Sequence, residues 1–180
     1  MAGSEEHVVL VDAQDRALGV LEKIAAHERG VLHRAFSVFV VREHDGRTEM
    51  LLQLRARAKY HFGGLWTNTC CGHPRSGESP VDAGQRRLPE EMNFDCALHA
   101  VGWFVYRARS DNGLTEHELD HVLLGHHQGE VPAPNADEAE RVRWVRLPEL
   151  DRELTEHPAS FTPWFAQGYA LVKQALQPRS

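Results

Sequence analysis

The chain has 180 residues and a formal net charge of −6, and apolar residues make up 42% of it. This length and composition are typical of one globular domain with a substantial core. The negative charge argues against broad attraction to nucleic acid or to an anionic membrane, and no apolar run is long enough to span a bilayer. We therefore expect no nucleic-acid or membrane partner, and an anionic substrate would need local cationic contacts.

The cysteines and the N-terminal segment indicate a reducing compartment. Cys70, Cys71 and Cys96 are an odd number of cysteines with two of them adjacent, which is unlike a disulfide framework. Residues 1–7 are acidic and lack the basic and apolar regions of a signal peptide. We expect free thiols, a cytoplasmic protein and, with the oligomeric state left open, a monomer.

Strands dominate the expected structure of the first half of the chain. Short β-branched runs that end in polar turns predict strands at 7–12, 35–41 and 49–55. The last two are joined by a hairpin turn at 44–47, and a short helix is expected at 21–27.

The strongest local signal in the chain is a helix from Ser79 to about Met92. Ser79 offers an N-cap, Pro80 suits the first helical position, and Asp82 stands at the capping-box position. Pro89 lies inside this helix, where it removes one backbone hydrogen bond and clashes with the preceding turn. We therefore predict a kink near Pro89.

The remaining elements complete a mixed fold. Strands are expected at 101–109, 114–126 and 141–147, with a turn at 111–113 and a loop at 131–140. Thr162 and Pro163 begin a last helix, and its apolar face carries Phe165, Tyr169, Val172 and Leu176. Strands mixed with a few helices predict an α/β or α+β fold, with a mixed sheet flanked by helices in one domain over 1–180.

Residues 72–94 resemble a Nudix box, with Gly72, Glu78 and the run Arg-Arg-Leu-Pro-Glu-Glu-Met-Asn-Phe at 86–94. Such a box is a loop–helix–loop in which helical carboxylates hold a hard divalent cation against a diphosphate. Glu90 and Glu91 are the candidate carboxylates, although two adjacent glutamates on a helix are more often a solvated charge pair. Arg87 stands where the hydrolytic boxes have a metal-binding glutamate.

Further patches resemble the type I isopentenyl-diphosphate isomerases, and they occur in the same order as in that family. They lie at 21–23, 25–27, 32–36, 66–74, 77–79, 116–118 and 161–164. The resemblance spans about 7–176 and implies a Nudix-type sandwich in which residues 1–30 form an N-terminal extension over the active site. It also implies interconversion of isopentenyl diphosphate and dimethylallyl diphosphate through a tertiary carbocation, as a step of isoprenoid biosynthesis.

The resemblance implies two metal sites. The first consists of His27, His33, His73, Glu116 and Glu118. The two glutamates are two apart on a predicted strand and share a face, and imidazoles with carboxylates suit Mn²⁺ or Zn²⁺. The second is a Mg²⁺ site formed by Glu91 and substrate phosphate oxygens. Seven further histidines match no motif position and are expected to be structural: His44, His61, His99, His121, His126, His127 and His157.

Substrate and catalytic residues are also implied by the resemblance. The cationic positions around the diphosphate are Lys23, Arg55, Lys59 and Arg87. The proton shift needs two proton-carrying groups on opposite faces of a dry pocket, matched here by Cys71 and Glu118. Glu118 is the expected proton donor, with Tyr106 beside it, and Trp164 would offer its π-face to the cation.

Two other functions stay open. A Nudix hydrolase of a nucleoside or other diphosphate would share the box and the divalent ion. It differs at Arg87, and it would not require Cys71, His73 or Glu118. A catalytically dead fold kept as a binding module is the third function, against which stands the presence of every polar residue that the isomerase chemistry needs. Displacement of Glu91 by Pro89 would weaken the activity. Cys70 is expected in the core, because alternation along an extended segment directs neighbouring side chains to opposite faces.

Overall fold

The computed structural model describes residues 6–178, so the expected acidic segment lies mostly outside the described residues. The strands are β1 (His7–Val11), β2 (Ala17–Glu22), β3 (His33–His44), β4 (Arg47–Arg55), β5 (Trp66–Thr67), β6 (Cys70–Gly72), β7 (Leu98–Arg109), β8 (Thr115–His126) and β9 (Ala139–Arg146). The helices are α1 (Lys23–Arg29), α2 (Pro80–Met92), α3 (Leu147–Glu156) and α4 (Phe165–Leu176), with a 3-10 turn at Pro158–Ser160. Among the described residues, none of the helices has the length and apolar character needed to cross a membrane.

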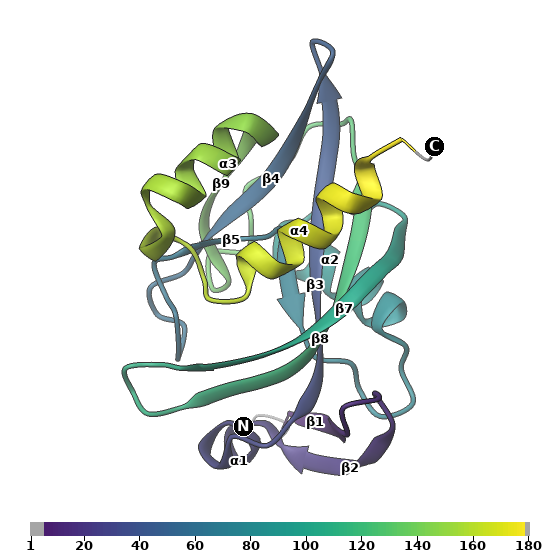
Figure 1. Cartoon of the computed structure of the whole chain (residues 1–180), viewed down its shortest axis with the longest axis vertical. Coiled ribbons are helices and arrows are strands. Elements are labelled where there is room, and N and C mark those ends of the chain that lie inside the picture. The colour runs from purple at the N-terminus through teal and green to yellow at the C-terminus, as the bar shows by residue number, and fades with distance from the viewer. Residues whose placement is uncertain (1–5, 179–180) are drawn as a thin grey trace.

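The long strand β3 organises the sheet (Figure 1). β8 pairs with it in parallel along one side, over His33–Val41. On its other side β1, β6 and β4 pair with it in succession. Side chains from β6 and β8 therefore approach from opposite sides of β3, although their segments are far apart in the chain.

Helices cover both faces of the sheet, as alternation along β3 requires. Phe39 and Val41 belong to one apolar cluster, which includes α4 and Leu150 of α3. Phe36, Val38 and Val40 belong to the opposite cluster, which includes the buried side chains of α2. In Figure 1, α3 and α4 lie in front of the sheet and α2 lies behind it. The predicted mixed sheet flanked by helices is confirmed.

The largest errors in the predicted elements concern β2, α1 and α3. The helix expected at 21–27 begins at Lys23, after β2, because the carboxylate of Glu22 accepts hydrogen bonds from the amides of Ile24 and Ala25 at 2.9 and 2.8 Å. β2 was not expected, because it is largely exposed and has no alternation of apolar and polar residues. α3 was also not predicted.

α2 begins as predicted and ends on a left-handed residue. Ser79 accepts a hydrogen bond from the amide of Asp82 at 3.1 Å, and Asn93 caps the other end at φ 58°. The helix is continuous through Pro89, so Pro89 does not end it, and the kink expected near Pro89 stays a prediction. Pro89 lies in the last turn of α2. The backbone hydrogen bond that it removes is therefore lost near the end of the helix, where few helical residues follow.

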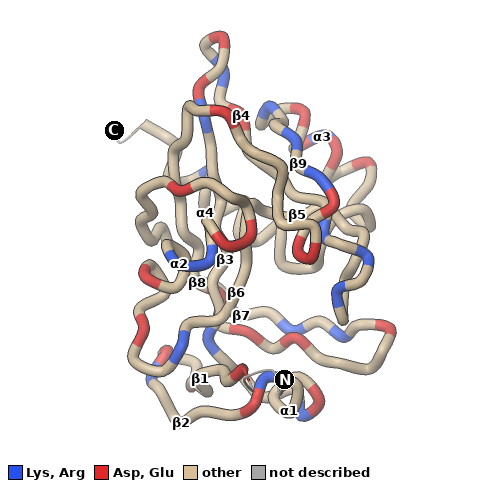
Figure 2. Tube along the Cα trace, turned by 180° about the vertical axis from the view of Figure 1, so that it is seen from behind, with Lys and Arg blue, Asp and Glu red and all other residues tan. Residues whose placement is uncertain are grey.

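Basic and acidic positions are interspersed along the trace (Figure 2). Many of these residues form local pairs, such as Arg16 with Asp12 at 2.6 Å and Arg143 with Glu153 at 2.6 Å. The negative net charge is thus spread over the molecule. A small anion would therefore bind to cationic side chains that line a pocket.

Packing of α2 against the sheet can be tested with Leu88→Ala. Leu88 has no exposed surface, so its truncation should lower the free energy of unfolding by about 2–5 kcal/mol. Leu18→Ala is the matched control, because Leu18 is 67% exposed and its truncation should change stability by less than about 0.5 kcal/mol. Urea unfolding monitored by circular dichroism measures both, and equal losses would contradict the packing described for α2.

Candidate active site

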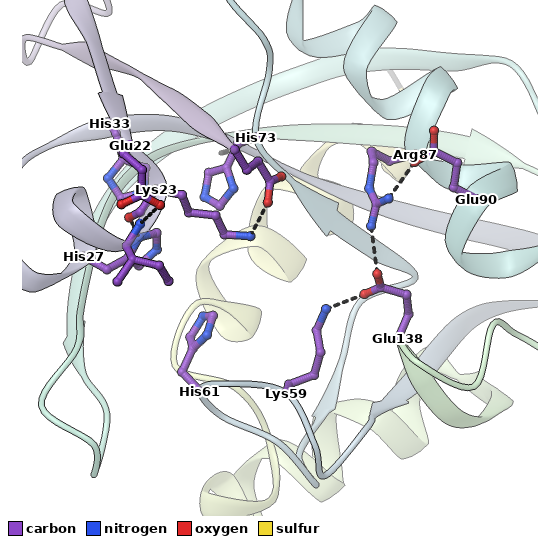
Figure 3. Close-up of polar contacts among 12 residues, drawn as sticks. Glu22, Lys23, His27, His33, Lys59, His61, His73, Arg87, Glu90 and Glu138 are labelled. Carbon is purple, nitrogen blue, oxygen red and sulfur yellow. Dashed lines mark hydrogen bonds and ion pairs between the residues drawn. The ribbon is translucent and has the colours of Figure 1, made fainter. Parts of the chain in front are cut away.

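A pocket opens at the end of the sheet where β3 begins, and polar side chains from many elements line it. The lining residues are Glu6, Lys23, Phe36, Ser37, Arg55, Lys59, Tyr60, His61, Cys71, Gly72, His73, Arg87, Glu91, Tyr106, Glu116, Glu118 and Trp164. Most residues proposed from the sequence are in this set. His27 and His33 are completely buried beside it, and Glu90, the other candidate carboxylate of the box, does not line it and pairs with Arg87. Figure 3 shows several of these side chains directed toward one another from separate elements.

Five residues in this region form a group that can hold a metal ion. His27, His33, His73, Glu116 and Glu118 each place one ligand atom within 4.8 Å of the others. His27 Nε2 lies 3.1 Å from Glu116 Oε2, and His73 Nε2 lies 2.9 Å from Glu118 Oε1. They are the five residues that the sequence suggested, and they come from α1, β3, β8 and the segment after β6.

Backbone carbonyls orient two of these imidazoles. His27 Nδ1 lies 2.6 Å from the carbonyl oxygen of Lys23, and His33 Nδ1 lies 3.0 Å from that of Val31. Because a carbonyl only accepts, each Nδ1 carries a proton and each Nε2 faces the carboxylates. His33 Nε2 is buried and makes no hydrogen bond, although it lies 3.4 Å from Glu118 Oε1. Nitrogen lone pairs and carboxylates that converge in this way fit a divalent cation.

Glu118 connects the metal group to Tyr106. Burial would raise the pKa of Glu118, but its contacts with His33 and His73 outweigh burial and hold the pKa well below its usual range. Glu118 Oε2 accepts a hydrogen bond from the hydroxyl of Tyr106 at 2.6 Å. Burial raises the pKa of Tyr106 well above its ordinary value. A carboxylate and a protonated phenol therefore share one short hydrogen bond.

The two adjacent thiols have different surroundings. Cys70 is fully buried in the apolar cluster under α2, whereas Cys71 lines the pocket. Burial raises the pKa of Cys71 to about 12, so its thiol is neutral near pH 7. Cys71 Sγ lies 3.2 Å from Asn68 Nδ2 and 3.7 Å from Ser37 Oγ.

Asn68 also holds Trp164. The indole Nε1 of Trp164 donates to Asn68 Oδ1 at 3.1 Å, and Asn68 has no exposed surface. The guanidinium carbon of Arg55 lies 5.4 Å from the Trp164 ring centroid, and the Tyr106 ring lies 5.8 Å from it. One buried amide thus connects the pocket thiol to an aromatic ring that already accepts a cation on its face.

A second polar group surrounds Arg87 at the other end of the pocket. Arg87 Nη2 donates to Glu91 Oε1 at 2.8 Å and to Glu138 Oε1 at 3.1 Å, and Glu138 Oε2 accepts from Lys59. Glu91 is buried and is not part of the five-residue metal group. Burial, followed by the charge of Glu138, raises the pKa of Glu91.

Several residues of this region were not predicted from the sequence, among them His61, Glu138 and Asn68. His61, expected to be structural, is buried in the pocket with Nε2 against Glu116 Oε1. Glu138 is in the loop between β8 and β9, and it does not correspond to a position of any motif in the sequence. Asn68 lies in the patch at 66–74 that resembles the isomerase family. Its position three residues before Cys71 was the only indication in the sequence of a role at the site. Loop residues reach the pocket through tertiary folding that periodicity does not describe.

The fold and this site define a NUDIX-domain protein. Residues 31–165 match the family model described as NUDIX domain. A crystal structure of DR0079 from Deinococcus radiodurans superposes with a TM-score of 0.73 at 18% identity, covering 96% of this chain and 100% of that one. The NUDIX domain of Shewanella oneidensis NrtR, solved with ADP ribose, gives a TM-score of 0.61 at 16% identity, covering 81% of this chain and 88% of that one. At such low sequence identity, these two similarities establish the shared fold alone.

Relatives with similar sequences identify the family within the NUDIX-domain proteins to which the chain belongs. An isopentenyl-diphosphate Delta-isomerase from Burkholderia multivorans is 50% identical over 97% of this chain and 95% of its own length. A second protein of that name, from Photobacterium profundum, is 51% identical over 91% of this chain and 92% of its own length. The chain belongs to the isopentenyl-diphosphate Delta-isomerase family, and the resemblance noted in the sequence is confirmed.

The five-residue group predicts a metal affinity that depends on His73. Loss of one imidazole in His73→Ala should weaken binding of Mn²⁺ or Zn²⁺ by more than about 100-fold, the upper end of the effect of outer-shell partners. His117→Ala is the control, because His117 lies between the two glutamates but has Nδ1 2.9 Å from the carbonyl oxygen of Gly30. Competition with a chromogenic chelator measures both affinities. Equal weakening in the two variants would argue against this metal site.

Proposed function

We propose that the chain interconverts isopentenyl diphosphate and dimethylallyl diphosphate. The observation that carries the proposal is one pocket that combines a neutral thiol, a metal-type His/Glu group and several cations. Cys71 is on β6 and Glu118 on β8, and these strands pair with opposite sides of β3. Names of the relatives support the same reaction. The small-molecule diphosphate is therefore the substrate, and the step belongs to isoprenoid biosynthesis.

The proton shift requires one proton added at the terminal alkene carbon and one removed from the carbon two positions along. Cys71 carries a neutral thiol, and the Tyr106 hydroxyl holds a second proton against Glu118 at 2.6 Å. In one direction the Glu118–Tyr106 pair gives a proton to the alkene while Cys71, as a thiolate, takes one and becomes the neutral thiol. The reverse reaction starts from that neutral thiol, which gives its proton back while the deprotonated pair takes one. The substrate lies between them.

The cation formed by alkene protonation needs protection from water and an electron-rich neighbour. Trp164 is 3% exposed and lines the pocket, so its ring can stabilise a positive charge by up to about 2 kcal/mol when desolvated. Asn68 fixes the edge of that ring through Nε1. Trp164 and Asn68 thus keep the π-face in a constant position relative to Cys71.

Two kinds of divalent ion fit the donor sets of the pocket. Mixed imidazole and carboxylate ligands favour Mn²⁺ or Zn²⁺ at the five-residue group, and Glu91 with phosphate oxygens favours Mg²⁺. The ion at the His/Glu group, when bound, supplies positive charge that polarises the carboxyl of Glu118. Lys23, Arg55, Lys59 and Arg87 bind the diphosphate, with Arg87 in place of a hydrolytic glutamate.

The N-terminal segment completes the pocket. Lys23 and His27 of α1 supply a cation and a metal ligand, and Lys23 donates to Glu6 at 2.8 Å. Residues 6–30, the described part of the extension expected at 1–30, therefore cover the site as part of a single domain. The free thiols Cys70, Cys71 and Cys96 suit the reducing cytoplasm.

Proton exchange with solvent tests the reaction. In deuterated water with isopentenyl diphosphate and Mg²⁺, the protein should form dimethylallyl diphosphate carrying deuterium, as followed by proton NMR. Cys71→Ala should lower kcat by at least about 100-fold, since general acid–base groups contribute about 10²–10⁴-fold. Cys70→Ala, which removes the neighbouring thiol from the core, should retain activity within about tenfold of the unsubstituted chain.

Two other results would overturn the proposal. Release of phosphate without an allylic product would indicate a Nudix hydrolase. A folded, metal-loaded protein that neither isomerises nor cleaves the substrate would indicate a binding module.

A further inference from the structure

One partly buried carboxylate pairs with two of the cations that line the pocket. Glu138, in the loop between β8 and β9, has a side chain that is 18% exposed. Its Oε2 accepts from Lys59 Nζ and its Oε1 accepts from Arg87 Nη2 at 3.1 Å, as Figure 3 shows. Burial opposes ionisation of Glu138, but these two cations outweigh it and lower its pKa. An ionised carboxylate thus joins two positions that are proposed to bind phosphate.

The backbone around Glu138 is held independently of this ion pair. The amide of Ala56 donates to the carbonyl oxygen of Glu138 at 3.0 Å, and the amide of Glu138 donates to that of Asn135 at 2.9 Å. Asn135 in turn donates its amide to the carbonyl oxygen of Glu91 at 2.8 Å. The side chain can therefore rotate away from Lys59 and Arg87 while the loop keeps its place on β4 and α2.

Carboxylate and phosphate oxygens compete for the same donors. A guanidinium and an ammonium bind either group through charge-assisted hydrogen bonds. Because Glu138 already occupies both cations, an incoming diphosphate must displace it or bind beside a fixed negative charge. Either course weakens binding of the diphosphate.

We infer that Glu138 is an internal competitor for the diphosphate, which sets how tightly Lys59 and Arg87 hold substrate and product. The inference rests on the proposed function. Isopentenyl and dimethylallyl diphosphates differ only in the position of a double bond, so binding through the diphosphate stabilises both equally and does not accelerate the chemical step. A competing carboxylate limits this shared affinity and speeds release of the product.

A different role for Glu138 has the opposite consequence. If its carboxylate joined Glu91 as a ligand of Mg²⁺, its removal would weaken binding of the diphosphate in the presence of Mg²⁺. The sign of the change in affinity therefore separates the two roles.

The experiment compares Glu138→Gln with Glu140→Gln. Both remove one negative charge near the start of β9, but Glu138 pairs with Lys59 and Arg87, whereas Glu140 pairs with the exposed Arg57. Calorimetry with isopentenyl diphosphate and with inorganic diphosphate, with and without Mg²⁺, measures the dissociation constants. Glu138→Gln should bind both about tenfold more tightly, a change of about 1.4 kcal/mol, while Glu140→Gln stays within about threefold of the unsubstituted chain.

Unchanged or weaker binding by a folded Glu138→Gln protein would overturn the inference, and so would an equal gain in Glu140→Gln. Should Glu138→Gln fail to fold, Glu138→Ala must show the same gain. The unsubstituted chain separates this failure from failure of the proposed function. If it isomerises isopentenyl diphosphate while Glu138→Gln binds no more tightly, only the role of Glu138 is rejected.

Discussion

Glu116 and Glu118 lie two residues apart on one face of β8, both buried, and their negative charges are the constraint on which the site depends. Buried carboxylates are unfavourable unless positive charge or hydrogen bonds compensate them. The chain brings histidines to them from α1, β3 and the segment after β6, with imidazole nitrogens directed inward. Strand β3 must lie between β6 and β8 for these groups to converge, so the order of strands follows from the same requirement.

The hydrogen bonds of Asn68 serve a comparable purpose on the apolar side of the pocket. This residue contacts both the thiol of Cys71 and the indole of Trp164, which belong to segments distant in sequence. Asn68 also donates to the carbonyl oxygens of Val38 and Cys70, at 3.1 and 2.8 Å. Its position is therefore fixed by the sheet, and the relative placement of thiol and indole follows from backbone geometry.

Strand periodicity and capping patterns explain what could be predicted from the sequence. The shared face of Glu116 and Glu118 and the cap at Ser79 follow from local rules, and the family resemblance brought the three histidines to them. His61 and Glu138 reach the pocket from loops, whose course depends on packing of the whole fold. β2 escaped prediction because it is exposed on a sheet edge and has no apolar alternation.

The parallel pairing of β3 with β8 also affects how the protein is made. His33 pairs in register with Glu118, and the residues between them form most of the NUDIX domain. A ribosome synthesises the three histidines long before the two glutamates, so a nascent chain displays imidazoles without their carboxylate partners. The metal group is complete only once β8 has left the exit tunnel and docked beside β3. Ion capture is thereby tied to the synthesis of β8, while β9, α3 and α4 still follow in the chain.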